Sequence, residues 1–308
     1  MRISDPIELY TYPEEWVRGQ AEIHGVGFVK SRISSGLYIL TENGWLRRGI
    51  TTGTTATAAA VGAISSLFGE TESVRVRTPA GIEVEVAVDA EDGYARARKF
   101  SGDHEFDVTD GIEIHARVSE DLEFGEGVGR LRGRPAVSRA VVEQLLENVE
   151  TARNQWGYDG SVRIWIPAGE MVAERTDNAR MGVTGGISLL GTTGFVEPWC
   201  RKLVETKVEI AKQYDRIAIT TGRKGWKWAL ENLREYQPFV FGVHLDEILK
   251  AHDGEIVIVG LPSLLVKWAV PELRGKVLKG RRLEGYRSRV LERAREINEG
   301  VVDVILLG

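Results

Sequence analysis

The sequence has a single cysteine, Cys200, among 308 residues, together with five histidines and three methionines. One cysteine cannot form an intrachain disulfide, and it excludes a zinc site built from several cysteines. The histidines lie at positions 24, 104, 115, 244 and 252. No two of them have the His-x-x-x-His spacing that places two metal ligands on one face of a helix. The sequence therefore indicates no metal site.

Long hydrophobic runs are absent too, so no segment reaches membrane-spanning length. The first residues, MRISDPIELYTYPEEW, contain no apolar stretch of the kind found in a secretory signal. With 40 basic and 45 acidic residues the net charge is -5, which argues against a general nucleic-acid binder. We therefore expect a cytoplasmic protein without nucleic-acid or membrane partners, and a homo-oligomer is compatible with this composition.

The first part of the chain predicts an α+β domain with a largely antiparallel sheet. Residues 1–30 read as irregular, and an Asn43-Gly44 turn joins strands expected at 37–40 and 45–48. A second hairpin is expected around residues 79–81, where apolar and charged residues alternate on both sides. A helix is expected at 136–153, followed by a strand in VRIWIP.

The last third predicts a different kind of sheet. The stretches DRIAITTG, PFVFGVHL, EIVIVGL and VVDVILLG are short and almost wholly apolar, and helical stretches separate them. Apolar strands that alternate with helices indicate a parallel sheet covered on both faces. We therefore expect a mixed fold of two domains: an α+β domain at 1–200 and a Rossmann-like parallel α/β domain at 201–308.

Residues 49–60, GITTGTTATAAA, are small residues and hydroxyls at the start of an expected helix, just after Arg47 and Arg48. A helix N-terminus has backbone N–H groups without partners and partial positive charge, so it suits an anion. Arg47, Arg48, Thr51, Thr52, Gly53 and Thr54 are therefore candidate substrate-binding residues. The alternative is a helix start that threonine side chains cap and that packs tightly against a sheet.

Residues 176–198, TDNARMGVTGGISLLGTTGFVEP, contain five glycines between positions 182 and 194. Glycine is costly in backbone entropy and is used where φ is positive or where a ligand approaches the backbone. This pattern favours a binding surface, and a series of tight turns is the alternative. The candidate residues are Thr176, Asn178, Gly185, Gly186, Ser188, Gly191, Thr192 and Thr193.

Two further stretches lie between these. In FDVTDGIEIHARV, Asp107, Thr109 and Asp110 flank Gly111, which is typical of a turn with an Asx-type hydrogen bond. The stretch EFGEGVGRL has the pattern G-x-G-x-G, and no apolar parallel strand precedes it, so it is not a dinucleotide-binding fingerprint.

Together these stretches resemble the CbiD family, the cobalt-precorrin-5B C1-methyltransferases. LRRGITTGTTATAAA is similar to that family's L-R-x-G-[YF]-T-T-G-[ST]-C-A-A-A-A, and VTDG, EGVG and IPAGEMVAERTDNARMGVTGGISLLGTTGFVEP resemble its later motifs in the same order. The resemblance covers residues 46–198. It implies transfer of a methyl group from S-adenosylmethionine to C1 of cobalt-precorrin-5B, giving cobalt-precorrin-6A in anaerobic cobalamin biosynthesis. Cobalt then belongs to the substrate only, and the VTDG motif adds Asp110 and Gly111 to the candidate residues.

The chain departs from the family pattern at several positions. Ile50 replaces an aromatic residue, and Thr55 replaces the usual cysteine, so we expect no thiolate chemistry. In VGLPSLLVKWAVPEL, Lys267 is kept, but the Gly-Lys pair and the histidine of many bacterial members are missing. These departures suggest an archaeal-type branch.

Methyl transfer from a sulfonium requires alignment and exclusion of water, and no acid for the leaving group, so a site of glycines and hydroxyls suits it. The substrate's carboxylates would need basic partners, for which Arg47, Arg48, Lys99, Arg175 and Arg180 are candidates, with a solvated surface charge as the alternative for each.

The loop after the first strand of the last third is a candidate site for the methyl donor. Thr221, Gly222 and Gly225 would lie at the carboxyl end of that strand, and Asp246 follows the next one. Asp246 could bind ribose hydroxyls or cap its helix, and no standard S-adenosylmethionine motif is present. A nucleotide- or phosphate-dependent transferase and a non-catalytic corrinoid-binding scaffold remain as alternative functions.

Overall fold

The computed structural model describes residues 1–273 and 285–307, and the chain divides into two compact units. Unit 1 contains residues 1–30, 40–44 and those from Cys200 onward, whereas unit 2 contains residues 31–39 and 45–199. The sequence predicts a boundary near residue 200, with domains at 1–200 and 201–308. In the structure, residues 1–30 belong to the same compact unit as the C-terminal part. No helix in the described ranges is long and apolar enough to cross a membrane.

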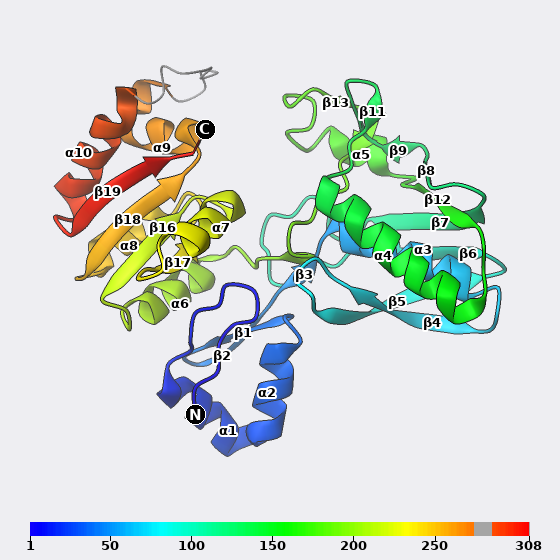
Figure 1. Cartoon of the computed structure of the whole chain (residues 1–308), viewed down its shortest axis with the longest axis horizontal. Helices are drawn as coiled ribbons and strands as arrows, with labels where there is room; N and C mark the ends of the chain where they lie inside the picture. The colour runs from blue at the N-terminus through cyan, green and yellow to red at the C-terminus, as the bar shows by residue number, and fades with distance from the viewer. Residues whose placement is uncertain (274–284, 308) are drawn as a thin grey trace. The chain divides into compact units, whose positions relative to one another are not determined.

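Unit 2 is built on a six-stranded sheet with the order β4-β5-β6-β7-β12-β8 (Figure 1). All neighbouring pairs are antiparallel except β12 and β8, which are parallel. Buried and exposed residues alternate in β5 because one face of the sheet is covered. The predicted antiparallel sheet and its hairpin around 79–81 are therefore confirmed. The strands are β4 (Thr71–Arg77), β5 (Glu83–Glu91), β6 (Tyr94–Arg98), β7 (Glu113–Ser119), β8 (Glu123–Phe124) and β12 (Ser161–Trp165).

Helix α3 (Thr52–Ser65) lies between this sheet and helix α4 (Arg139–Trp156), with contacts to both. Every residue of α3 from Thr52 to Ile64 is buried. Its small residues allow this close packing, since a Cβ at Gly62 would lie 3.1 Å from the Cβ of Ala95 on β6. A helix with small residues on all sides can approach a sheet and a second helix together.

Short strands form a second region of unit 2. Strand β3 pairs with β15, β9 pairs in parallel with β14, and β10 lies between β11 and β13. These pairings bring together segments far apart in the sequence. The elements are β3 (Gly49–Ile50), β9 (Gly127–Val128), β10 (Arg130–Leu131), β11 (Arg134–Pro135), α5 (Gly169–Ala173), β13 (Val183–Thr184), β14 (Gly186–Ile187) and β15 (Phe195–Val196).

Unit 1 contains a four-stranded sheet with the order β17-β16-β18-β19, in which every pair is parallel. The strands coincide with the four apolar stretches, so the prediction of parallel pairing is confirmed. They are β16 (Arg216–Thr220), β17 (Gln237–Val240), β18 (Glu255–Gly260) and β19 (Val301–Leu306). The helices are α6 (Arg201–Ala211), α7 (Arg223–Asn232), α8 (Leu245–Ala251), α9 (Pro262–Ala269) and α10 (Arg287–Ile297), with a 3-10 turn at Pro271–Leu273.

The expectation that residues 1–30 are irregular is wrong. They form helix α1 (Glu14–His24) and the start of α2 (Val26–Ser34), and α1 begins directly after Pro13 with two glutamates in its first turn. Both signals favour a helix start. Helix α9 was also not expected, although Pro262 stands at its first position. The hairpin of β1 (Tyr38–Thr41) and β2 (Gly44–Arg47) was predicted correctly.

Candidate functional site

The start of α3 is bound to the glycine-rich stretch that follows α5. The Thr52 hydroxyl donates to the carbonyl oxygen of Ser188 at 3.2 Å and accepts from the amide of Leu190 at 3.0 Å. The amide of Gly53 donates to the carbonyl oxygen of Leu190, and the Thr54 hydroxyl donates to that of Gly194 at 2.9 Å. The structure therefore joins two of the stretches that the sequence marks as binding surfaces.

These contacts agree with the alternative of a capped and tightly packed helix start. Thr51 is the N-cap of α3, and its hydroxyl accepts from the amide of Thr54 at 3.2 Å. Thr51 and Thr52 are 9% and 7% exposed, and Thr54 is fully buried. A Cβ at Gly53 would lie 2.3 Å from Val141 on α4, so protein atoms fill the space beside it.

Arg48, a predicted substrate-binding residue, is buried and paired within the protein. Its Nε atom donates to Glu197 Oε1 at 3.0 Å, and NH1 donates to the carbonyl oxygen of Gly36 at 3.1 Å. Its side chain is 0% exposed, and its role toward the substrate stays a prediction. Arg47 is exposed, and its guanidinium carbon lies 4.0 Å from the centre of the Phe100 ring.

The Asp107–Gly111 stretch is the expected Asx turn, in which the amide of Thr109 donates to Asp107 Oδ1 at 2.9 Å. Lys99 is buried, and its Nζ atom contacts Asp107 Oδ2 at 2.5 Å. Burial raises the pKa of Asp107, but the hydrogen bonds from Lys99 and Thr109 outweigh burial and hold that pKa well below its usual range. Asp110 is exposed, and its Oδ1 accepts from the Ser101 amide. This cluster fixes the turn.

Three glycines allow three segments of unit 2 to meet backbone to backbone. A Cβ at Gly186 or at Gly169 would lie 2.1 Å from the carbonyl oxygen of Gly127. A Cβ at Gly127 would lie 1.8 Å from the carbonyl oxygen of Ile166. Gly186 is thus required for close packing, and its role toward a ligand stays a prediction.

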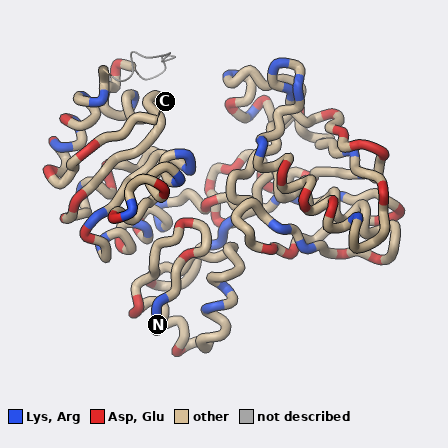
Figure 2. The backbone as a smooth tube through the Cα atoms, viewed as in Figure 1, with Lys and Arg blue, Asp and Glu red and all other residues tan. Residues whose placement is uncertain are grey.

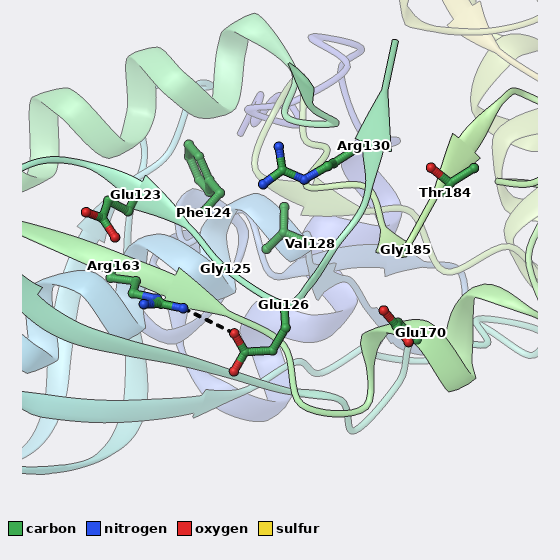
Figure 3. Close-up of a pocket in the computed structure, with 10 residues that line it drawn as sticks. All are labelled: Glu123, Phe124, Gly125, Glu126, Val128, Arg130, Arg163, Glu170, Thr184 and Gly185. Atoms are coloured by element: carbon green, nitrogen blue, oxygen red, sulfur yellow. Dashed lines mark hydrogen bonds and ion pairs between the residues drawn. The ribbon is translucent and has the colours of Figure 1, made fainter. Parts of the chain in front are cut away.

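Gly185 differs from its neighbour. Its φ is +71°, and apart from its chain neighbours no atom of the described residues lies within 4 Å of the position that a Cβ would take. Gly185 also lines a hollow of about 430 Å³ that lies wholly in unit 2 (Figure 3). In Figure 3, Arg130 points into this hollow between Phe124 and Val128. The lining residues are Glu123, Phe124, Gly125, Glu126, Val128, Arg130, Arg163, Glu170, Thr184 and Gly185.

Residues from three of the stretches that carry the family resemblance line this hollow. Glu126 belongs to EGVG, Glu170 to IPAGE, and Gly185 to VTGG. Arg163 lies within hydrogen-bonding reach of Glu126, with NH2 3.4 Å from Oε2. Of the predicted site residues only Gly185 is in this lining. The charged side chains were missed because the motif stretches were read for glycines and hydroxyls.

The other predicted residues of the stretch lie in turns. The Thr176 hydroxyl donates to the carbonyl oxygen of Ala173, and Asn178 Nδ2 donates to that of Gly186 at 3.2 Å. Thr193 forms a local hydrogen bond with Phe195, and a Cβ at Gly191 would lie 2.4 Å from Thr51 Oγ1. The structure leaves Thr192 exposed and Ser188 half-buried.

The predicted donor site lies in unit 1. Thr221 follows β16 and lines a hollow of about 280 Å³ with Gly242, Val243, Leu245, Leu264, Lys267 and Trp268. Gly222 and Gly225 flank the start of α7 and are outside this lining, and a Cβ at Gly225 would lie 2.8 Å from the carbonyl oxygen of Val259. Asp246 Oδ1 accepts from the indole N–H of Trp268 at 2.8 Å, so it does not cap its helix.

A carboxylate of the protein itself lies beside Arg223, a basic residue of this loop. Glu8 is fully buried, and its Oε1 lies 2.7 Å from Lys207 Nζ and 3.5 Å from Arg223 NH2. Among the described residues no group of three or more His, Cys, Asp and Glu side chains could hold a metal ion.

Comparisons with known proteins agree with the resemblance. The family model described as CbiD matches residues 40–198. A cobalt-precorrin-5B C(1)-methyltransferase of Archaeoglobus fulgidus is 56% identical over 304 residues, which cover 98% of this chain and 94% of that protein. One of Methanococcoides burtonii is 38% identical over 286 residues, or 89% of this chain and 84% of that protein. The crystal structure of the cobalamin biosynthesis protein CbiD from Archaeoglobus fulgidus matches with a TM-score of 0.86 and 56% identity over 99% of both chains. The chain therefore belongs to the CbiD family.

Proposed function

We propose that this protein transfers a methyl group from S-adenosylmethionine to C1 of cobalt-precorrin-5B, giving cobalt-precorrin-6A in anaerobic cobalamin biosynthesis. The observation that carries the proposal is the identity of 56% over 98% of the chain with a protein named for this methyl transfer. Relatives that are 38% and 37% identical over 89% and 95% of the chain carry the same name.

The chemistry requires little from acids and bases. The bond between the methyl carbon and sulfur breaks, its electron pair stays on sulfur, and C1 supplies the pair for the new bond. The positive charge that leaves sulfur passes to the conjugated macrocycle, and loss of one proton from the macrocycle to water balances it. The protein has to align the two carbons and exclude water. Rigid elements such as the buried helix α3 are suited to holding such an alignment.

The donor site that we propose is the hollow of unit 1 whose lining residues come from the segments that follow β16, β17 and β18. The switch point of this sheet lies between the carboxyl ends of β16 and β18, because β17 and β18 lie on opposite sides of β16. Ligands of open parallel sheets bind at such a point, which supports a Rossmann-like role for this unit. Thr221 offers a hydroxyl, and Trp268 offers an aromatic surface for a purine. We keep three residues as candidates for binding the donor because they lie beside this hollow: Gly222, Gly225 and Asp246.

The test is turnover by the purified protein under anaerobic conditions. The protein is incubated with cobalt-precorrin-5B and S-adenosylmethionine, and the corrinoid is followed by mass spectrometry. We expect a gain of one methyl group that requires both the protein and the donor. A corrinoid that binds without gaining a methyl group would instead support the scaffold alternative, and turnover that requires a nucleoside triphosphate would support the nucleotide-dependent transferase. A cytoplasmic location and a homo-oligomer stay predictions.

A further inference from the structure

The turn between β10 and β11 contains an arginine in an unusual backbone conformation. Arg132 has φ +53°, and the next residue, Gly133, has φ +77°. Two positive φ angles in a two-residue hairpin loop are typical of a type I′ turn, for which Asn-Gly and Asp-Gly are the preferred sequences. Arginine is disfavoured in this region because its Cβ approaches the following carbonyl oxygen.

The same protein contains a matched turn with the preferred sequence. Asp92 and Gly93 join β5 to β6 with φ of +46° and +76°. The chain thus uses Asp-Gly in one hairpin and Arg-Gly in the other. Backbone strain that local sequence could have avoided is concentrated at functional sites in proteins. Arg132 is therefore a candidate functional residue on geometric grounds.

The Arg132 turn carries a concentration of positive charge. Arg130, Arg132 and Arg134 fall within five residues, and Figure 2 shows the blue stretch that they form beside the label of β11 in Figure 1. All three are exposed. In the described part of the chain, neither Arg132 nor Arg134 has an ion-pair partner. Arg130 NH1 donates to the neutral carbonyl oxygen of Gly133 at 3.2 Å.

Strand pairing fixes this turn beside the hollow of unit 2. Arg130 is the register partner of Thr184 on β13, and both residues line the hollow. Gly185, which follows Thr184, leaves open space at the same place. The basic turn, the open glycine and the motif glutamates therefore meet at one part of the surface.

We propose that Arg130, Arg132 and Arg134 bind peripheral carboxylates of the corrinoid substrate, with the edge of the macrocycle placed over the hollow beside Gly185. This inference rests on the proposed function, which supplies a substrate with several carboxylates. Arginine pairs with carboxylates in bidentate geometry, and a row of three suits a ligand that carries acidic groups along its rim. The cost of holding Arg132 at positive φ is then offset by substrate binding.

The variant that tests this inference is Arg132→Asn, because asparagine suits the turn and removes the charge. We expect a melting temperature equal to or above that of the parent protein, with KM for cobalt-precorrin-5B raised about tenfold or more and kcat within about twofold. One factor of ten corresponds to about 1.36 kcal/mol, slightly less than the roughly 1.5–3 kcal/mol of one hydrogen bond to a charged group. Added salt should raise the parent's KM more steeply than the variant's.

Two control variants separate turn effects from charge effects. Asp92→Asn changes the matched turn, and Arg75→Gln removes an exposed charge on β4, which is at the opposite edge of the sheet from β8. Both should leave KM unchanged. The inference is overturned if the parent turns over and Arg132→Asn keeps its KM and salt dependence. If the parent binds the corrinoid but does not methylate it, the proposed function fails. The inference is then decided by the Kd for cobalt-precorrin-5B, which should be higher for Arg132→Asn than for the parent.

Discussion

Thr52 is the residue at which the binding and packing interpretations of the α3 start differ most clearly. Its hydroxyl accepts from the amide of Leu190 at 3.0 Å and donates to the carbonyl oxygen of Ser188 at 3.2 Å. Thr52→Val keeps the shape of the side chain and removes both hydrogen bonds. The Leu190 amide would then lose its partner at a site where water has little access, since Thr52 is 7% exposed.

The structure predicts a loss of stability in this variant. A buried donor left without a partner costs about 1–3 kcal/mol. A loss of about 2 kcal/mol lowers the melting temperature by roughly 4–8 °C in a unit of about 150–250 residues. Because the hydroxyl faces backbone groups of the protein, kcat/KM measured well below the melting temperature should stay within about threefold of the parent value.

Thr57→Val is the matched control for Thr52→Val. The Thr57 hydroxyl is also buried but donates to the Gly53 carbonyl oxygen of its own helix at 2.9 Å. That oxygen keeps the hydrogen bond that it accepts within the helix, so removing the Thr57 hydroxyl should cost less than about 1 kcal/mol of stability. Thermal unfolding and steady-state kinetics are measured for all three proteins. A ten- to hundred-fold fall in kcat/KM for Thr52→Val with an unchanged melting temperature would refute the packing interpretation and restore the anion cradle.

Three further predictions concern the same account. Gly186→Ala should destabilise the protein far more than Gly185→Ala, because only the former places a Cβ 2.1 Å from a carbonyl oxygen; equal melting temperatures would contradict the packing role of Gly186. Arg48→Met should cost about 3–5 kcal/mol in urea unfolding, since it removes the guanidinium that pairs with the largely buried carboxylate of Glu197, and the double variant with Glu197→Gln should recover part of that loss. Burial lowers the pKa of His252 below 6.5, despite the charges of two nearby aspartates, so the unfolded chain binds its proton more readily and stability should fall as pH drops through about 6.5. His252→Asn should make that pH dependence shallower, and an unchanged slope in urea midpoints between pH 7 and 5 would count against it.

Much of the fold follows from local sequence patterns. Alternation of apolar and charged residues predicts β4 to β7, because one face of an antiparallel sheet is solvated. Continuous apolar runs predict β16 to β19 of the parallel sheet, of which β16 and β18 are almost wholly buried. Helices α1 and α2 were missed since α1 buries only Trp16 and Val17, and so few buried positions give a weak helical period.

The candidate site is less accessible to sequence reasoning because long-range pairing creates it. Glu126 and Gly185 come together only through the parallel pairing of β9 with β14, a pairing that no local pattern specifies. Arg130 reaches the same hollow through the pairing of β10 with β13. Conversely, Arg48 reads as a surface charge in the sequence, and its buried partner Glu197 lies 149 residues away.

The measurement that tests the central claim most directly is the position of the transferred methyl group. The protein is supplied anaerobically with cobalt-precorrin-5B and S-adenosylmethionine labelled with ¹³C in its methyl group, and the corrinoid product is isolated for NMR. The account predicts one labelled methyl group, bonded to C1 of the macrocycle, with one S-adenosylhomocysteine formed for each. Label at another position, or label absent from the corrinoid while the protein binds it, would contradict the account.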